Sequence, residues 1–197
     1  MPSVKVLAYL AGLEDSIKTA QKMGITTLTQ PSSYYGLSLV LGGGEVKLLD
    51  MTSAYGVFAA DGMRYPVHGI LEIKDKNGNI IEKNSFKPVR VISSKTARLI
   101  NDILSDNQAR APIFGLNSSL FIPGYQVAAK SGTTQDFKDG WVIGYTPSLV
   151  VGVWVGNNNG IPISRDPAVI TAGPIWKSFM LKVLPLFPNQ TFPPPLK

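Results

Sequence analysis

The sequence contains no cysteine and only one histidine among its 197 residues. Without cysteine the chain has neither a disulfide framework nor thiolate chemistry, and the redox state of its compartment stays open. The single histidine excludes a cluster of histidine metal ligands. His68 also stands between turn residues, which favours a surface side chain over a general base. We therefore expect neither a metal nor any other cofactor.

Long hydrophobic runs and basic runs are also missing. No stretch approaches the roughly 20 apolar residues of a membrane-spanning helix, and no basic segment with an apolar core and a cleavage site marks an export signal at the N-terminus. The formal charge of +6 and the pI of about 9.5 permit nucleic-acid binding. However, the cations are scattered and are not interleaved with aromatic residues. A mildly basic surface near an anionic cell envelope fits as well, and we expect no nucleic-acid partner.

What is present is the composition of one folded domain, with 44% hydrophobic and 16% charged residues. Helical spacing of apolar residues predicts a helix from Pro2 to Gly12, a second helix that Gly24 closes, and a third over residues 45–60. The third helix carries a stripe that we expect to face the core, made of Leu48, Met51, Tyr55 and Phe58. Residues 31–44 are rich in serine, tyrosine and glycine, which predicts a loop.

The rest of the chain contains both β and helical patterns. Ile70–Glu82 predicts a β-hairpin with a type I′ turn at Asn77-Gly78, where both residues need positive φ. A short strand over residues 89–92 follows, and Ser93 or Ser94 is placed to cap the next helix. The last helix, residues 175–184, offers four side chains to a sheet, Trp176, Phe179, Met180 and Val183. From Pro185 onward we expect an extended linker or a ragged end.

The stretch from Gln126 to Asn159 organises the chain. Its three β-rich segments are separated by short turns and predict three adjacent antiparallel strands. The first segment ends in residues that suit an anionic acyl ligand, namely Lys130, Ser131, Gly132, Thr133 and Thr134. Lys130 offers a positive charge, and the hydroxyls offer hydrogen bonds. Gly132 lets a ligand lie against the backbone and pair with it as an extra strand. Alone, these five residues also fit an ordinary strand that runs into a turn.

In context, this stretch resembles a known family. Residues 127–158 are similar to the Lys-Thr/Ser-Gly strand and following hairpin of penicillin-binding proteins, the serine acyltransferases that cross-link peptidoglycan. Three more stretches resemble the bifunctional class A type, Leu39–Val46, Met51–Ala59 and Leu104–Pro112. The resemblance extends to about Met180. It implies that residues 1–184 form the C-terminal portion of a transpeptidase domain, followed by a proline-rich tail over 185–197. It also implies an α+β fold like that of the serine β-lactamases, with an antiparallel sheet flanked by helices.

The resemblance implies roles for the individual residues. Lys130 and Ser131 would position the substrate's carboxylate, beside the substrate-binding Gly132. The backbone N–H of Thr133 would complete an oxyanion hole, and Thr134 would line the cleft. The partners would be peptidoglycan stem peptides that end in D-Ala-D-Ala, together with β-lactams.

The family's nucleophile is missing from this sequence. It stands in Ser-x-x-Lys, where the lysine amine takes the proton of the serine, but no lysine here has a serine three residues before it. We therefore expect this chain alone to be inactive. Ser105-Asp106-Asn107 spells a β-lactamase motif. It lies only about 25 residues before Lys130 and follows a helix end, so we reject it as catalytic.

The resemblance also implies a longer parent protein. In the family, Ser-x-Asn precedes the equivalent of Met1-Pro2-Ser3-Val4, so we expect Met1 to be an internal or artificial start. The parent would carry a glycosyltransferase domain behind one membrane helix, on the extracytoplasmic face of the bacterial plasma membrane. It would contact the membrane only through these upstream segments. An alternative is a non-catalytic ligand-binding or assembly module of the cell-wall machinery, and a third is nucleic-acid binding.

Overall fold

The structure is a computed structural model that describes residues 2–85 and 87–196. The first elements are α1 (Pro2–Val6), the π-helical turn η1 (Leu7–Ala11), α2 (Leu13–Met23), α3 (Ser32–Tyr35), the 3-10 turn η2 (Gly36–Leu41), α4 (Leu48–Ala59), β1 (Met63–Arg64), β2 (Glu72–Lys74), β3 (Ile80–Lys83), β4 (Val89–Arg90) and α5 (Ser94–Ser105). There follow α6 (Asn107–Phe114), β5 (Ala128–Thr133), the 3-10 turn η3 (Gln135–Phe137), β6 (Asp139–Thr146), β7 (Leu149–Gly156), α7 (Ala168–Thr171), α8 (Gly173–Val183) and η4 (Leu184–Leu186). Antiparallel strands mixed with helices confirm the predicted α+β class.

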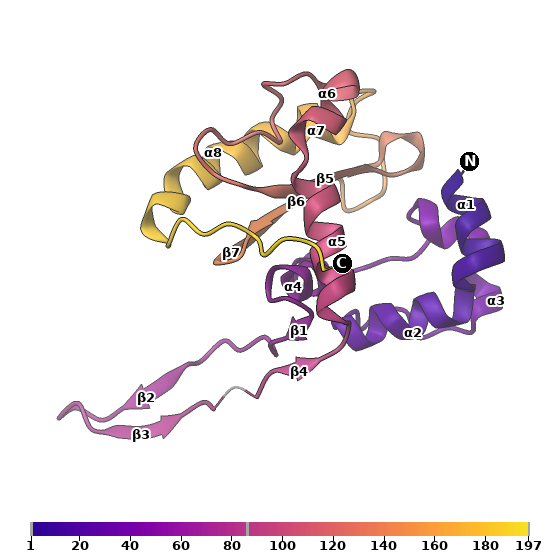
Figure 1. The fold of residues 1–197 in the computed structure, drawn as a ribbon. Helices are drawn as coiled ribbons and strands as arrows, with labels where there is room; N and C mark the ends of the chain where they lie inside the picture. Colours follow the sequence, from indigo (N-terminus) through magenta and orange to yellow (C-terminus); the bar gives the residue numbers. More distant parts are fainter. Residues whose placement is uncertain (1, 86, 197) are drawn as a thin grey trace.

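A three-stranded antiparallel sheet lies between two layers of helices (Figure 1). Its strand order is β5-β6-β7, as the sequence predicts. Helices α4 and α5 pack against one face of the sheet, and α7 and α8 pack against the other. Short turns join consecutive strands, so their register is regular, with Lys130 opposite Ile143 and Trp141 opposite Trp154.

The largest cluster of buried apolar residues lies on the face toward α8. Trp176 is fully buried there, and its Nε1–H donates to the carbonyl oxygen of Val151 at 3.2 Å. Gly144 makes this approach possible, because a Cβ at that position would lie 2.2 Å from Cζ2 of Trp176. Met180, one helical turn further on, is also fully buried, whereas Phe179 is 49% exposed. The prediction for Phe179 is therefore wrong, since the helix turns that side chain toward solvent.

The opposite face of the sheet packs on α4 and on the C-terminal tail. Phe192 in the tail is buried and meets the ring of Tyr145 edge-on, at 5.6 Å between ring centroids. The N–H of Phe192 donates to Oε1 of Gln126 at 2.8 Å, and the Asn189 side chain donates to the carbonyl oxygen of Gly124 at 3.1 Å. The tail is extended but packs on the body, so the expectation of a linker or ragged end is wrong. The buried ring of Phe192 holds the tail against the body, although the proline content of the tail predicts an extended linker.

The N-terminal helices follow the predicted pattern up to Gly24, which ends α2 in a left-handed conformation with φ of 115°. The predicted loop over residues 31–44 is wrong in part, because α3 and η2 occupy most of it. The third helix, α4, begins three residues later than predicted. Its most buried residues are Ala54 and Val57, while Leu48 of the predicted stripe is 37% exposed. These two small residues pack on a cluster that includes Ile17 and Met23 of α2, and a pattern that counts only large side chains misses them.

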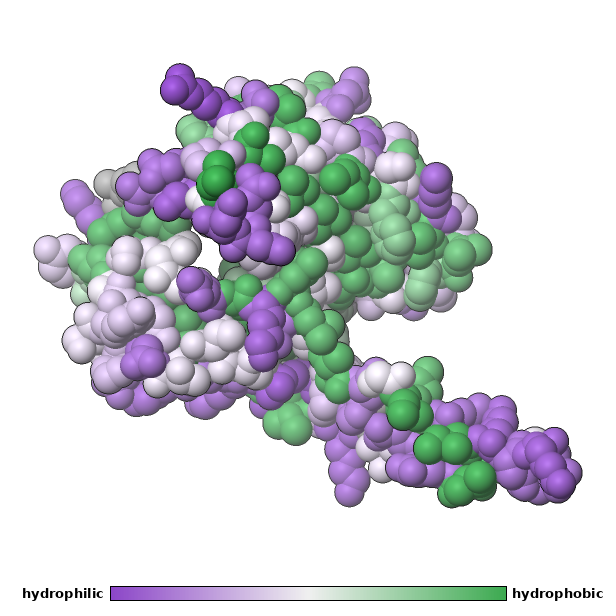
Figure 2. Space-filling model, turned by 180° about the vertical axis from the view of Figure 1, so that it is seen from behind, coloured by the Kyte–Doolittle hydropathy of each residue, from purple (hydrophilic) through white to green (hydrophobic). Residues whose placement is uncertain are grey.

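The predicted hairpin is present and projects from the body as an arm formed by β2 and β3 (Figures 1 and 2). All residues of both strands are exposed, and apolar patches alternate with polar ones along the arm. The predicted type I′ turn is wrong, because only Gly78 has positive φ. Instead, Oδ1 of Asp75 accepts from the N–H groups of Asn77 and Asn79, at 2.8 and 2.9 Å. The carboxylate closes a longer turn.

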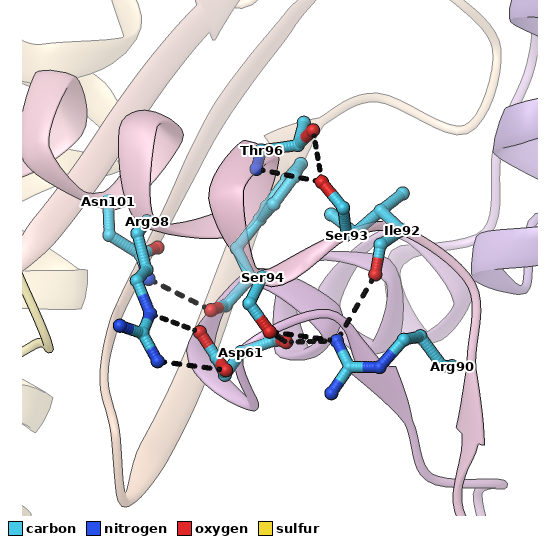
Figure 3. Close-up of polar contacts among 9 residues, drawn as sticks. Asp61, Arg90, Ile92, Ser93, Ser94, Thr96, Arg98 and Asn101 are labelled. Carbon is cyan, nitrogen blue, oxygen red and sulfur yellow. Dashed lines mark hydrogen bonds and ion pairs between the residues drawn. The ribbon is translucent and has the colours of Figure 1, made fainter. Parts of the chain in front are cut away.

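A polar network joins the end of α4 to the start of α5 (Figure 3). Arg98 donates to both carboxylate oxygens of Asp61, with Nε 2.9 Å from Oδ1, and this bond lowers the pKa of Asp61. The Ser93 hydroxyl accepts from the N–H of Thr96 at 3.1 Å, so Ser93 is the helix cap. Asn101 is 1% exposed and donates to the carbonyl oxygen of Phe58 at 3.0 Å.

Asn101 also links this network to the sheet, because its Oδ1 accepts a hydrogen bond from the buried Tyr145 hydroxyl at 2.8 Å. Replacing Asn101 with leucine should lower the free energy of unfolding by about 1–2 kcal/mol, since the tyrosine hydroxyl is then buried without a partner. Urea denaturation followed by circular dichroism measures this loss. In the double variant Asn101→Leu/Tyr145→Phe the hydroxyl is removed as well, so a smaller loss is expected. A loss in the double variant larger than that in Asn101→Leu would contradict the explanation.

Candidate functional site

An open pocket of about 900 Å³ lies between the sheet and the chain that leads into α4. One wall is formed by β5, β6 and β7, and the other by η2, the glycine-rich segment after it, and α4. All five residues predicted to bind the ligand line this pocket, namely Lys130, Ser131, Gly132, Thr133 and Thr134. We call these five residues the cradle. The structure therefore brings the predicted site residues together in one cavity.

The strand register places the cradle on the free edge of the sheet. Within the described residues, β5 pairs only with β6 and leaves its other edge open. Directly paired residues of antiparallel strands share a face, so Lys130 and Gly132 lie on the same face as Ile143 and Trp141. A Cβ at Gly132 would meet only Trp141, at 3.7 Å. The backbone at Gly132 is therefore open toward the pocket.

Lys130 is the one cation among the residues that line this pocket. Its side chain is exposed by surface area, yet protein atoms surround the amine closely enough that partial desolvation lowers its pKa. In the ligand-free chain the amine donates to the backbone carbonyl oxygen of Ser131. A carboxylate that enters the pocket would offer this ammonium a stronger acceptor than a carbonyl.

The three hydroxyls of the cradle differ in what they bind. The Thr133 hydroxyl oxygen accepts from the N–H of Ala168 at 2.9 Å, which ties β5 to α7. The Thr134 hydroxyl donates to Oδ2 of Asp139 at 3.3 Å and accepts from its N–H at 2.9 Å. The Ser131 hydroxyl has no hydrogen-bond partner in residues 2–85 and 87–196. Of the three, the half-buried Ser131 hydroxyl is thus the one with no hydrogen bond to give up when a ligand binds.

Several pocket residues were missed by sequence reasoning. Asp139 and Glu45 are its acidic members, and Trp141, Trp154 and Tyr55 form much of its aromatic wall. The tryptophans alternate with valines along apolar strands, so the sequence pattern does not say which set faces a cavity. The signal for Asp139 was its place after a turn, at the first position of β6, opposite the end of the cradle.

The Ser105-Asp106-Asn107 motif and His68, both considered from the sequence, lie outside the pocket. Asp106 caps α6, where its Oδ1 accepts from the N–H of Ala109 at 2.9 Å, and Ser105-Asp106-Asn107 does not line the pocket. His68 is exposed at the base of the arm, where Nδ1 lies 2.8 Å from the amide nitrogen of Asn84. Across the described part of the chain, no cluster of acidic or histidine side chains could hold a metal ion. The same residues include no helix with the length and apolarity to cross a membrane.

Comparison with known proteins supplies the family context. Residues 10–180 match the family described as the penicillin binding protein transpeptidase domain. The chain is 34% identical over 183 residues to penicillin-binding protein 1A of Aquifex aeolicus. The alignment covers 92% of this chain and 24% of the relative. It is 33% identical over 175 residues to penicillin-binding protein 1A of Mycobacterium tuberculosis, covering 80% of this chain and 20% of the relative. The chain thus spans about a quarter or less of these relatives.

Solved structures give the same answer for the fold. The penicillin-binding protein PonA1 from Mycobacterium tuberculosis superposes with a TM-score of 0.83 at 26% identity, over 98% of this chain and 56% of that one. PonA1 in complex with penicillin V superposes with a TM-score of 0.82 at 28% identity and the same coverage. Both superpositions cover nearly the whole chain.

Proposed function

The chain belongs to the family of penicillin-binding protein transpeptidase domains, and on that premise we propose that it provides the carboxylate-binding wall of a serine D,D-transpeptidase site. The observation that carries this proposal is the position of Lys130–Thr134, on an open sheet edge that lines the large pocket. An edge strand offers main-chain hydrogen bonds to an extended peptide, and Lys130 offers charge to its carboxylate.

The proposed reaction is acyl transfer between stem peptides of peptidoglycan. A serine oxygen attacks the carbonyl of the penultimate D-Ala and a lysine amine takes the serine proton. The C–N bond then breaks, and the terminal D-Ala takes up this proton and leaves as a free amine. An amine of a second stem peptide then displaces the serine. Lys130 and Ser131 hold the terminal carboxylate, and the Thr133 N–H donates to the developing oxyanion. Thr134 and Gly132 shape the cleft around the peptide.

This division of labour leaves the chemistry to a serine outside the 197 residues. Because no Ser-x-x-Lys is present, we infer that this chain binds substrate without turnover. The relatives are about four times longer, which supports a parent protein with further domains. The parent's glycosyltransferase domain, membrane helix and extracytoplasmic position belong to the same proposal. The complex of PonA1 with penicillin V supports β-lactams as ligands of the complete site.

The test is a comparison of two peptides that differ only at the C-terminus. Nα,Nε-diacetyl-L-Lys-D-Ala-D-Ala with a free carboxylate should bind the chain about three- to tenfold more tightly than its C-terminal amide, because the amide keeps its hydrogen bonds but loses the charge. Titration followed by NMR measures both affinities. Equal affinities, or binding that does not shift the signals of Lys130–Thr134, would contradict the proposal.

A second candidate is a non-catalytic binding or assembly module of the cell wall. Two observations favour it: the binding wall is formed within this chain, and the sequence contains no Ser-x-x-Lys nucleophile. The two candidates differ in the complete reading frame. A Ser-x-x-Lys encoded upstream of Met1 supports the transpeptidase, and a chain that starts at Met1 in the cell supports the module.

A further inference from the structure

We propose that two copies of this chain associate through the arm, by pairing the outer edge of β2 with the same edge of β2 in the second copy. The proposal is independent of the transpeptidase reaction, because no residue of β2 or β3 lines the pocket beside the cradle. Figure 1 shows that the arm projects away from the sheet and the helices, so a second chain can reach it.

The arm is incomplete as a sheet. It has two strands, and within residues 2–85 and 87–196 neither of them pairs with a third. All residues of both strands are exposed, including Ile73, Ile80 and Ile81. An isolated two-stranded hairpin is only marginally stable in water, and an unpaired strand edge is a template for another strand. A partner that adds strands to the arm therefore stabilises it.

The two edges of the arm differ in regularity. Ile73 pairs with Glu82 and Lys74 pairs with Ile80, so Ile81 is an extra, unpaired residue in β3. Such a bulge bends its strand and disrupts pairing along it. The extra residue lies on β3 and none lies on β2, so the outer edge of β2 is the one suited to a further strand.

The backbone of β2 shows which groups face this outer edge. The carbonyl oxygen of Leu71 and the N–H of Asp75 both bond to backbone groups that flank β3, at 2.9 Å each. The direction of these bonds alternates along a strand. The N–H and C=O groups of Glu72 and Lys74 therefore point to the outer edge, where a second strand would meet them.

The stretch Glu72-Ile73-Lys74 is complementary to itself when it runs antiparallel. With Ile73 opposite the partner's Ile73, each Glu72 lies opposite the Lys74 of the other copy. The outward backbone groups fit this register, because the Glu72–Lys74 pairs exchange N–H···O=C bonds and the isoleucine pair between them exchanges none. Opposite charges directly across from each other stabilise an antiparallel pair. A strand that supplies its own complement favours a second copy as the partner, related by a two-fold axis at Ile73.

The single arm already holds these side chains on the required faces. Nζ of Lys74 lies 2.7 Å from Oε1 of Glu72, so the two charged side chains share one face. Ile73 lies on the other face with 40% of its surface exposed, and Leu71, two residues away, shares that face and is 63% exposed. Pairing brings the two isoleucines side by side and removes apolar surface of both arms from water.

The first experiment is disulfide cross-linking of the full 197-residue chain, which contains no cysteine of its own. Opposite residues of a non-hydrogen-bonded pair have Cα atoms about 4.5 Å apart, a distance that a disulfide spans. Ile73→Cys should therefore form a covalent dimer under mild oxidation with copper phenanthroline. Non-reducing gel electrophoresis over time measures the rate.

Ile81→Cys is the matched control for this cross-link. Ile81 is the same residue type on the other strand of the arm and is more exposed, at 69% against 40% for Ile73, so random collision would favour it. In the paired arms, β2 and its copy separate the two β3 strands, which places the two cysteines at position 81 roughly 14 Å apart. Ile81→Cys should therefore cross-link about tenfold more slowly than Ile73→Cys.

Charge reversal tests the register. In the Ile73→Cys background, Glu72→Lys or Lys74→Glu places like charges opposite each other and should slow cross-linking by about five- to tenfold. A mixture of these two variants restores opposite charges across the axis and should recover most of the rate. Glu82→Lys on β3 changes the charge of the arm as Glu72→Lys does, and it should alter the rate by less than about twofold.

The possible results either support or overturn the proposal. Equal rates for Ile73→Cys and Ile81→Cys indicate random collision and overturn it. Charge reversals without effect on the rate, or a mixture as slow as its two components, overturn the register. No covalent dimer of Ile73→Cys overturns the pairing of two copies and leaves the arm to a partner of different chemistry. A thermal melt of each variant by circular dichroism checks that the compared chains are folded.

Discussion

Replacement of Lys130 with methionine should lower the affinity of the chain for a peptide ending in D-Ala-D-Ala by roughly ten- to hundredfold. A hydrogen bond between charged groups in a partly desolvated site contributes about 1.5–3 kcal/mol. Methionine keeps an unbranched apolar stem of similar length, so the loss reports the ammonium and not the packing. Lys130 is also the one cation of the pocket lining, so no other lysine or arginine of that lining takes its place. NMR titration of both chains with the same peptide measures the ratio.

Lys138 provides the control for this substitution. It is an exposed lysine in the turn between β5 and β6, and it does not line the pocket. Lys138→Met removes the same charge from the same part of the surface and should change the affinity by less than about twofold, because exposed charges are screened by salt. Equal losses in the two variants would show that Lys130 acts only through the net charge of the protein.

The sheet could be predicted from the sequence because its signals are local. Apolar strands, short polar turns and the five residues from Lys130 to Thr134 all lie within Gln126–Asn159, and the structure forms adjacent strands there. Period-2 patterning determines strand neighbours when the connections are too short for a crossover. The cavity beside the cradle was not predictable in the same way. It depends on where η2 and α4 pass, and α4, the nearer of the two, ends at Ala59, well before β5 begins at Ala128.

The differences came from side-chain contacts, one long-range and two within a turn, that local composition does not show. Phe192 turns a proline-rich tail into a packed segment, because Tyr145 on the sheet provides an aromatic surface for it. Asp75 replaces the predicted two-residue turn with a longer one. Its carboxylate accepts hydrogen bonds from the backbone N–H groups of Asn77 and Asn79. The bond between Asp139 and Thr134 joins residues that a sequence pattern assigns to separate segments. In each case a single side chain decides the local structure.

Incubation with penicillin should leave the mass of this chain unchanged. Acylation by a β-lactam requires a serine whose proton a neighbouring base removes, and the sequence contains no Ser-x-x-Lys that would supply such a pair. Ser131 is the serine nearest to a lysine in the pocket, but it follows Lys130 directly on β5. Adjacent residues of a strand point to opposite faces, so the Lys130 amine is not oriented to take the proton of Ser131. The contact that the structure does show joins this amine to the backbone carbonyl of Ser131, which carries no proton to transfer.

Intact-protein mass spectrometry after incubation with excess penicillin V decides the matter, with a transpeptidase domain that contains Ser-x-x-Lys as the positive control. The control should gain one drug mass, and this chain should gain none. A stable gain that maps to Ser131 would make the cradle itself a nucleophilic site and would contradict the role proposed for it. If the mass is unchanged while the free peptide still binds in a manner that depends on Lys130, recognition and chemistry are physically separate in this fold. The carboxylate-binding wall then works without the serine, because its charge, its open strand edge and its fixed hydroxyls are all set by contacts within this chain.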